Sequence, residues 1–188
     1  MAIAAAPTEL DGVRILEPVR HEDNRGWFEE SWSRRALIEA GIATEFVQDN
    51  HSVSDRSGTL RGMHCQAPPY EQSKLVRCTR GAILDVVFDL RTGSPTFEKW
   101  QAFQLSAKNG LQLFVPAGLL HGFMTLHDDA HVQYRTSAYY SPEAELTVRW
   151  DSLGIEWPND VSPILSDRDR QALPYSQIVS PFIFGGAK

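Results

Sequence analysis

The stretch Ile83-Leu84-Asp85-Val86-Val87-Phe88-Asp89-Leu90 has the length and the β-branched and aromatic content of a strand. Alternate residues of a strand face opposite sides. One face carries only the apolar side chains of Leu84, Val86, Phe88 and Leu90. The other face mixes aliphatic residues with Asp85 and Asp89, which is typical of the lining of a small barrel that holds a polar ligand. A solvent-facing side with two surface aspartates is the alternative.

Five further short apolar runs follow, with turn residues between them. They are residues 100–105, 111–115, 122–126, 132–136 and 146–150. The connections contain Gly-Ser-Pro, Lys-Asn-Gly and Ser-Pro-Glu, which are turn signals. Short strands at this spacing predict an all-β antiparallel sandwich or barrel.

Only residues 31–41 have a clear helical signature, with serines as N-caps and Gly41 as the stop. Residues 1–7 are mildly apolar but lack the basic and apolar regions of a signal peptide, and we interpret them as a frayed end. No linker separates two halves of the chain. We therefore expect a single domain over residues 1–188, with a few short helices.

Composition excludes several classes of protein. The chain has 18 Lys and Arg against 24 Asp and Glu, a net charge of -6, which argues against a nucleic-acid-binding protein. No apolar run approaches ~18 residues, which argues against a membrane protein. Cys65 and Cys78 are too few for a secreted disulfide scaffold or a CxxC zinc site. Free thiols and a cytoplasmic location are the expectation.

The candidate catalytic and ligand-binding side chains are most concentrated between Gln48 and Arg77. Arg61, His64 and Lys74 could converge from neighbouring strands as a phosphate ligand, a base near neutrality and a cation for a developing oxyanion. On a regular strand Arg61 and His64 would face opposite sides, so convergence requires a bulge at Gly62 or the end of the strand there. A surface arginine and a hydrogen-bonded core histidine are the alternative.

Six ordered segments extend this pattern along the chain. They are Asp23-Asn24-Arg25-Gly26-Trp27-Phe28-Glu29-Glu30, Leu60-Arg61-Gly62-Met63-His64, Lys74-Leu75-Val76-Arg77, Asp89-Leu90-Arg91-Thr92-Gly93-Ser94-Pro95-Thr96-Phe97, Pro116-Ala117-Gly118-Leu119-Leu120-His121-Gly122-Phe123 and Leu165-Ser166-Asp167-Arg168-Asp169. The series resembles the dTDP-4-dehydrorhamnose 3,5-epimerase family of cupin-type enzymes. The resemblance implies a cupin jelly-roll barrel, a homodimer whose N-terminal arm crosses to the partner, and catalysis without metal or organic cofactor.

The resemblance also implies roles for individual residues. The catalytic set is the base His64, its partner Asp169, the proton donor Tyr134 and Lys74. The substrate-binding set is Arg25, Phe28, Glu30, Gln48, Asn50, Arg61, His121, Tyr140, Glu145 and Arg168. Within it Arg61 is the diphosphate ligand, Tyr140 stacks on the nucleotide base, and His121 faces the sugar with Lys74.

The implied reaction inverts C3 and C5 of dTDP-4-dehydro-6-deoxy-D-glucose and gives dTDP-4-dehydro-L-rhamnose. Hydrogens next to the C4 ketone are acidic because the carbanion delocalises onto O4 as an enolate. Epimerisation then needs a base on one face, a donor on the other and positive charge near O4. His64, Tyr134 and Lys74 have these properties.

Several departures from the family pattern lie near the expected site. Met63 replaces a leucine, Leu119-Leu120 a phenylalanine-alanine pair, Cys65 a phenylalanine, and Arg168 a common lysine. The alternatives are a mono-epimerase of C3 or C5 acting on a dTDP-, CDP- or GDP-linked 4-ketosugar, and a non-catalytic sugar-nucleotide-binding cupin. A metal-dependent cupin normally needs a His-x-His pair, and none occurs in the sequence.

Overall fold

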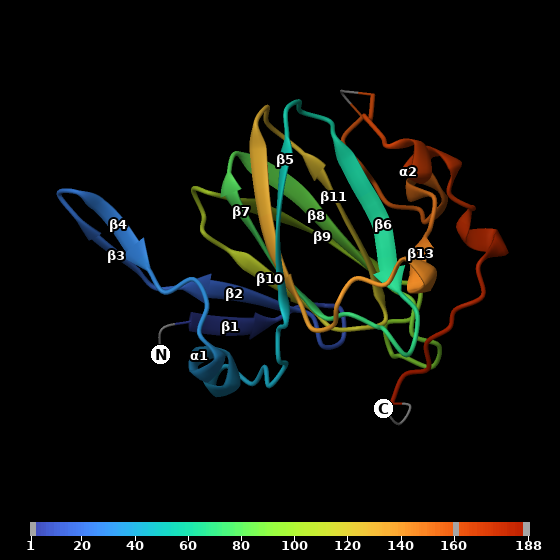
Figure 1. The fold of residues 1–188 in the computed structure, drawn as a ribbon, viewed down its shortest axis with the longest axis horizontal. Coiled ribbons are helices and arrows are strands. Elements are labelled where there is room, and N and C mark those ends of the chain that lie inside the picture. Colours follow the sequence, from blue (N-terminus) through green and yellow to red (C-terminus); the bar gives the residue numbers. More distant parts are fainter. Residues whose placement is uncertain (1–2, 160–161, 186–188) are drawn as a thin grey trace.

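The protein is described by a computed structural model, which covers residues 3–159 and 162–185. Two sheets face each other as a barrel-like sandwich, and a separate two-stranded hairpin projects from it (Figure 1). The helices are α1 (Arg34–Glu39), α2 (Asp167–Gln171) and the 3-10 helices η1 (Pro142–Ala144), η2 (Trp150–Ser152) and η3 (Tyr175–Gln177). The all-β prediction with a few short helices is confirmed.

The larger sheet has six strands in the order β1, β2, β10, β7, β12, β5, and every neighbouring pair is antiparallel. Its strands are β1 (Ile3–Pro7), β2 (Arg14–Pro18), β5 (Gln48–Ser54), β7 (Lys74–Arg80), β10 (Gln112–Val115) and β12 (Ala130–Thr136).

The smaller sheet has five antiparallel strands in the order β13, β6, β11, β8, β9. Its strands are β6 (Leu60–Gln66), β8 (Ala82–Asp89), β9 (Trp100–Ser106), β11 (Leu119–Thr125) and β13 (Glu145–Thr147). Five of the six predicted runs are strands over most of their length. The sixth, residues 146–150, was predicted too long, because the chain leaves β13 after Thr147 and turns into η2.

The interpretation of residues 1–7 as a frayed end was wrong for the described residues. β1 pairs with β2 from Ile3 opposite Pro18 to Pro7 opposite Arg14, and Ile3 is buried. An Asp-Gly turn before β2, with Gly12 at a φ of 76°, returns the chain antiparallel to β1. That turn signal was present in the sequence.

Helix α1 lies inside the predicted helical segment. Ser33 is its N-cap and accepts a hydrogen bond from the Ala36 amide, while Gly41 adopts a φ of 81° just beyond the last turn. Leu37 packs with Leu16 of β2 in a cluster that covers one outer part of the larger sheet. The helix is shorter than residues 31–41 because its capping serine is Ser33 rather than Ser31.

Strand β8 is covered on both faces. Its outer face carries Val86 and Phe88, which pack with Leu153 and Phe182 from the C-terminal part of the chain. Its inner face contributes to the core between the sheets, which consists of Leu10, Val13, Val76, Cys78, Ile83, Val87, Leu105, Leu113, Val115, Leu119, Phe123, Ala130 and Val132. The apolar core face predicted for residues 83–90 is therefore confirmed.

The two aspartates of β8 have no exposed surface, so the solvent-facing alternative was wrong. Asp89 accepts hydrogen bonds from Arg91, Ser94 and Thr96 and fixes the turn after β8. Asp85 instead contacts His121. Of the two carboxylates on this face of β8, Asp89 therefore has a structural role, and Asp85 lies beside the pocket.

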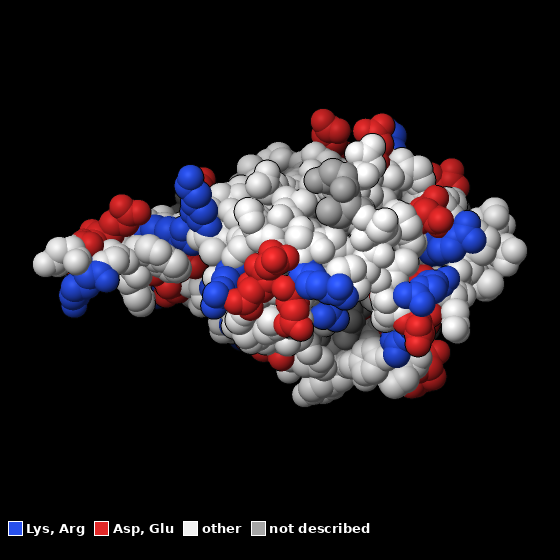
Figure 2. All heavy atoms as spheres, turned by 90° about the horizontal axis from the view of Figure 1, so that it is seen from above, with Lys and Arg blue, Asp and Glu red and all other residues white. Residues whose placement is uncertain are grey.

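The hairpin of β3 (Arg20–Asp23) and β4 (Gly26–Glu29) extends away from both sheets (Figure 1). Figure 2 shows it as a narrow arm with acidic and basic side chains along it. At its base Glu29 accepts a hydrogen bond from Arg20 at 2.8 Å and pairs with Arg77 at 3.6 Å. No described helix has the length and hydropathy of a membrane span.

Candidate active site

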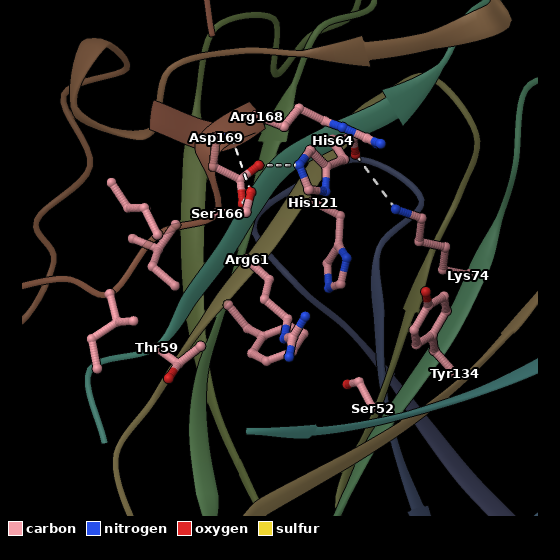
Figure 3. A pocket seen from close by; sticks show the side chains of 14 residues that line it. Ser52, Thr59, Arg61, His64, Lys74, His121, Tyr134, Ser166, Arg168 and Asp169 are labelled. Atoms are coloured by element: carbon pink, nitrogen blue, oxygen red, sulfur yellow. Dashed lines mark hydrogen bonds and ion pairs between the residues drawn. The ribbon is translucent and has the colours of Figure 1, made fainter. Parts of the chain in front are cut away.

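A pocket of about 590 Å³ opens between the two sheets and the segment that carries α2 (Figure 3). Seven residues singled out in the sequence line it: Arg61, His64, Lys74, His121, Tyr134, Arg168 and Asp169. They come from β6, β7, β11, β12 and α2. The predicted convergence of these side chains is thus present in the structure.

A bulge in β6 makes this convergence possible. His121 pairs with His64 and Phe123 pairs with Arg61, so β6 has one extra residue relative to β11. Gly62 has a φ of 139°, and a Cβ there would lie 2.5 Å from the Gly122 Cα. The bulge predicted at Gly62 is therefore confirmed, and it places Arg61 and His64 in the same pocket.

His64 and Asp169 form a tight pair. The His64 Nε2–H donates to Asp169 Oδ1 at 2.6 Å. Burial would raise the pKa of Asp169, but hydrogen bonds from His64 and Ser166 outweigh it and lower that pKa. The carboxylate is thus ionised at neutral pH, and His64 Nδ1 is left free to accept a proton.

Asp169 is held by its own helix start. Ser166 is the N-cap of α2: its Oγ accepts from the Asp169 amide at 3.1 Å and donates to Asp169 Oδ2 at 2.9 Å. Two parallel bridges attach the surrounding segment to the barrel, Thr59 with Ile164 and Val148 with Leu173. The C-terminal segment thereby delivers Asp169 to the ring of His64.

A second histidine faces the pocket from β11. His121 lies opposite His64, and its Nε2 is 3.0 Å from both oxygens of Asp85. Burial lowers the pKa of His121, although the charge of Asp85 acts in the opposite direction. The pocket therefore contains two histidine–aspartate pairs in different surroundings.

Lys74 and Tyr134 complete the reactive groups. Burial lowers the pKa of Lys74, although Asp85 and Glu145 oppose this, and its Nζ donates to the His64 carbonyl oxygen at 3.4 Å. Burial also raises the pKa of Tyr134, so its phenol stays protonated near neutrality. Figure 3 shows Lys74 between His64 and Tyr134. A histidine, a lysine and a tyrosine thus face one cavity.

A connected set of polar groups extends from Arg168, which lines the pocket. The Tyr140 hydroxyl donates to Glu145 at 2.5 Å, and Arg168 pairs with the same carboxylate. The Tyr140 amide donates to Gln48 Oε1 at 3.2 Å, and the Gln48 amide donates to Asn50 at 2.8 Å. Of these residues only Arg168 lines the pocket, and the others are linked to it through this chain of contacts, with the Tyr140 ring half exposed.

Arg25, Phe28 and Glu30 do not line this pocket. Arg25 and Phe28 belong to the projecting hairpin and Glu30 follows it. Phe28 is 70% exposed, and the Arg25 guanidinium pairs with Asp23 on the same hairpin. None of these three residues is therefore part of the pocket of its own chain.

Sequence reasoning missed several residues that line the pocket. They are Ser52, Thr59, Leu60, Phe123, Ile164, Leu165 and Ser166. A capping signal, serine followed three residues later by an acidic residue, could have identified Ser166 as the anchor of Asp169. The others have no local signal, because long-range strand pairing and the returning C-terminal segment bring them to the pocket.

Neither cysteine contributes a reactive group. Both are buried free thiols, and burial raises the pKa of Cys65 to about 12. Cys65 packs with Met63 on the outer face of β6, as a small apolar residue does. Among the described residues, no three His, Cys, Asp or Glu side chains gather in a way that could hold a metal ion.

Comparison with known proteins identifies the family of this chain. The sequence profile of dTDP-4-dehydrorhamnose 3,5-epimerases matches residues 7–177. This chain belongs to the dTDP-4-dehydrorhamnose 3,5-epimerase family. The resemblance seen in the sequence is confirmed, and so is the enzyme class, an isomerase that acts on carbohydrates.

Individual relatives agree with this membership. The dTDP-4-dehydrorhamnose 3,5-epimerase of Sinorhizobium fredii is 45% identical over 163 residues, which are 84% of this chain and 82% of the relative. A Legionella pneumophila epimerase solved with dTDP-4-keto-L-rhamnose has a TM-score of 0.91 and 36% identity, covering 98% of this chain and 100% of that one. ChmJ, a 3'-monoepimerase from Streptomyces bikiniensis solved with dTDP-quinovose, has a TM-score of 0.85 and 38% identity, covering 90% and 87%. The cupin jelly-roll fold expected from the sequence is confirmed by these structures.

Proposed function

We propose that this chain is a cofactor-independent epimerase that inverts C3 and C5 of dTDP-4-dehydro-6-deoxy-D-glucose and forms dTDP-4-dehydro-L-rhamnose. The geometry that carries the proposal is the His64–Asp169 pair, with the partly buried Lys74 between it and Tyr134. The names of the family relatives agree with this activity.

Each reactive group has one task in this reaction. His64 takes the proton from C3 or C5 through Nδ1, because its Nε2–H is engaged by Asp169. The Asp169 carboxylate stabilises the imidazolium that forms. Lys74 places positive charge near O4 as the enolate develops, in a site from which much of the water is excluded. Tyr134 returns a proton to the opposite face.

The remaining residues hold the nucleotide. Arg61 contacts the diphosphate, and its guanidinium is already fixed, since Nε donates to Ser54 Oγ at 3.2 Å and Nη2 to the Val53 carbonyl at 3.1 Å. Gln48, Asn50, Tyr140, Glu145 and Arg168 form the nucleotide end at the mouth. Binding energy from this end positions the sugar ring for proton transfer.

We further propose that residues 1–188 form one domain that acts as a homodimer in the cytoplasm. The hairpin places Arg25 and Phe28 away from the pocket of its own chain, so they can contact substrate only in the pocket of a second copy. Two buried free thiols are typical of proteins in a reducing compartment.

Proton NMR of dTDP-4-keto-6-deoxy-D-glucose in deuterated buffer, coupled to an NADPH-dependent 4-ketoreductase, tests the activity. We expect deuterium at both C3 and C5 and formation of dTDP-L-rhamnose. His64→Asn abolishes exchange and keeps nucleotide affinity, while Tyr134→Phe allows proton loss but slows inversion. Retained exchange in His64→Asn would remove His64 from the role of base.

Inversion at C3 alone is the second candidate, because the similar ChmJ is a 3'-monoepimerase. Label confined to C3 in the same experiment would select it. If dTDP-linked substrate shows no exchange, CDP- and GDP-linked 4-ketosugars are tested next. Failure of all three to exchange, with tight binding of a sugar nucleotide, would favour a non-catalytic binding protein.

Mixed dimers test the crossing of the hairpin. His64→Asn lacks the base but has an intact arm, and Arg25→Ala has an intact base but a defective arm. When the two inactive variants are unfolded together and refolded, a crossing arm gives mixed dimers with one complete site, and exchange returns. If each arm served its own pocket, no mixture would recover activity.

A further inference from the structure

Asp85 is a buried carboxylate with a single hydrogen-bond donor. It has no exposed surface, and both of its oxygens lie 3.0 Å from His121 Nε2. The described part of the chain offers this carboxylate no other hydrogen bond. A carboxylate buried in this way is unfavourable without a hydrogen-bond donor, and a proton on His121 Nε2 supplies one.

That proton determines what His121 presents to the pocket. Burial lowers the pKa of His121, which favours the neutral ring at neutral pH. A neutral ring protonated at Nε2 has a lone pair on Nδ1. Within the described residues Nδ1 has no hydrogen bond, and the ring points into the pocket in Figure 3. His121 Nδ1 is therefore a hydrogen-bond acceptor on the wall of the pocket.

Lys74, which also lines the pocket, is a hydrogen-bond donor. Lys74 Nζ carries only N–H bonds, and it lies in the same pocket, where it donates to the His64 carbonyl oxygen at 3.4 Å. A 4-ketosugar presents the matching pattern on adjacent carbons: the C4 carbonyl oxygen accepts and the 3-hydroxyl donates. The donor Lys74 thus matches the carbonyl oxygen of an α-hydroxyketone, and the acceptor His121 matches its hydroxyl group.

We propose that Asp85 is a positioning residue that holds His121 as a neutral acceptor for the sugar 3-hydroxyl, while Lys74 donates to the ketone oxygen. The inference rests on the proposed function and adds to it the residue that fixes the His121 tautomer and the substrate hydroxyl that it recognises. This contact orients the C3–C4 bond, and with it the acidic hydrogen on C3, relative to His64. A sugar without the 3-hydroxyl leaves Nδ1 unpaired.

Asp89 provides a matched control on the same strand. It lies four residues from Asp85, is equally buried, and bonds to Arg91, Ser94 and Thr96 rather than to a pocket residue. Asp89→Asn therefore reports what loss of a buried charge in β8 does to the fold. Asp85→Asn adds the loss of the group that enforces the tautomer, since an amide both donates and accepts.

The tautomer is measured by nitrogen NMR of histidine-labelled protein, with His121 assigned by a His121→Phe variant. We expect His121 in the unchanged protein to carry its proton on Nε2, a mixture of tautomers in Asp85→Asn, and the unchanged signal in Asp89→Asn. A proton on Nδ1 in the unchanged protein would overturn the proposal, as would an unchanged His121 signal in Asp85→Asn.

Calorimetric binding of dTDP-glucose and dTDP-3-deoxyglucose, which have no ketone and do not react, tests the hydroxyl. The unchanged protein and Asp89→Asn should bind dTDP-glucose about three- to tenfold more tightly, the range for one hydrogen bond. Asp85→Asn should lose most of this preference. Equal affinities in the unchanged protein refute the role of the 3-hydroxyl while epimerase activity remains. Absence of deuterium exchange with every 4-ketosugar would instead refute the proposed function itself.

Discussion

Replacement of Gly62 by alanine should disrupt both the fold and the site. Gly62 has a φ of 139°, a conformation that residues with a Cβ rarely adopt. A Cβ at this position would lie 2.5 Å from the Gly122 Cα and 3.2 Å from the His121 carbonyl oxygen. Both are backbone atoms of a paired strand, so neither moves without displacing β11.

The magnitude follows from two contributions. The backbone conformation costs a residue with a Cβ about 1–3 kcal/mol, and overpacking of a core adds about 1–3 kcal/mol. The free energy of unfolding should therefore fall by roughly 2–6 kcal/mol, a large part of the 5–15 kcal/mol typical of a domain. At about 2–4 °C per kcal/mol for a chain of this size, Tm falls by roughly 4–24 °C.

Thermal unfolding followed by circular dichroism, with deuterium exchange into substrate on the same samples, measures both effects. Gly154→Ala is the matched control, because Gly154 has a φ of 69° and a Cβ added there would meet nothing within 4 Å. It should lose only about 1 kcal/mol from backbone conformation and keep its exchange rate. Equal Tm shifts in the two variants, or normal exchange in Gly62→Ala, would refute the role assigned to the bulge.

Three further outcomes are expected. Burial lowers the pKa of Lys74 from its usual 10.5, so activity should fall with rising pH at pH values below 10.5. Lys74→Arg should keep its activity over the same pH values, since arginine stays charged, and a pH profile of Lys74→Arg with the same alkaline fall would contradict this. Ser166→Ala should lower the free energy of unfolding by about 1 kcal/mol through loss of the helix cap, and it should also slow deuterium exchange into substrate because Asp169 loses an anchor. A fall in Tm with an unchanged exchange rate would contradict the anchoring role of Ser166. Cys65, whose pKa is raised by burial to about 12, should resist iodoacetamide at pH 8 in the folded protein and react after unfolding, as mass spectrometry would show.

Local signals in the sequence predicted the features that depend on local geometry. The alternation in residues 83–90 identified β8 and its two faces, and Ser33 and Gly41 mark the ends of α1 as capping chemistry requires. The requirement that Arg61 and His64 converge predicted the bulge at Gly62. Each of these depends on residues that are close in the sequence.

Long-range contacts account for what the sequence left open. Alternation assigned Asp85 and Asp89 to one face but could not show that one meets His121 and the other Arg91, because that depends on strand register and on the turn after β8. Strand β1, for example, was missed because its stability comes from pairing with β2 and from burial of Ile3. The separation of Arg25 from the pocket likewise follows from the direction of the hairpin, which no local pattern specifies.

Because α2 is attached to the barrel by few contacts, activity can be lost while the two sheets remain folded. Asp169 belongs to a C-terminal segment that wraps the outside of the smaller sheet, and isolated bridges at Ile164 and Leu173 flank it. Segments attached in this way open at a lower free energy than the strands of a core. Release of this segment by heat or by a protease would extinguish catalysis in a molecule whose barrel is still folded, so inactivation should precede the loss of β-structure.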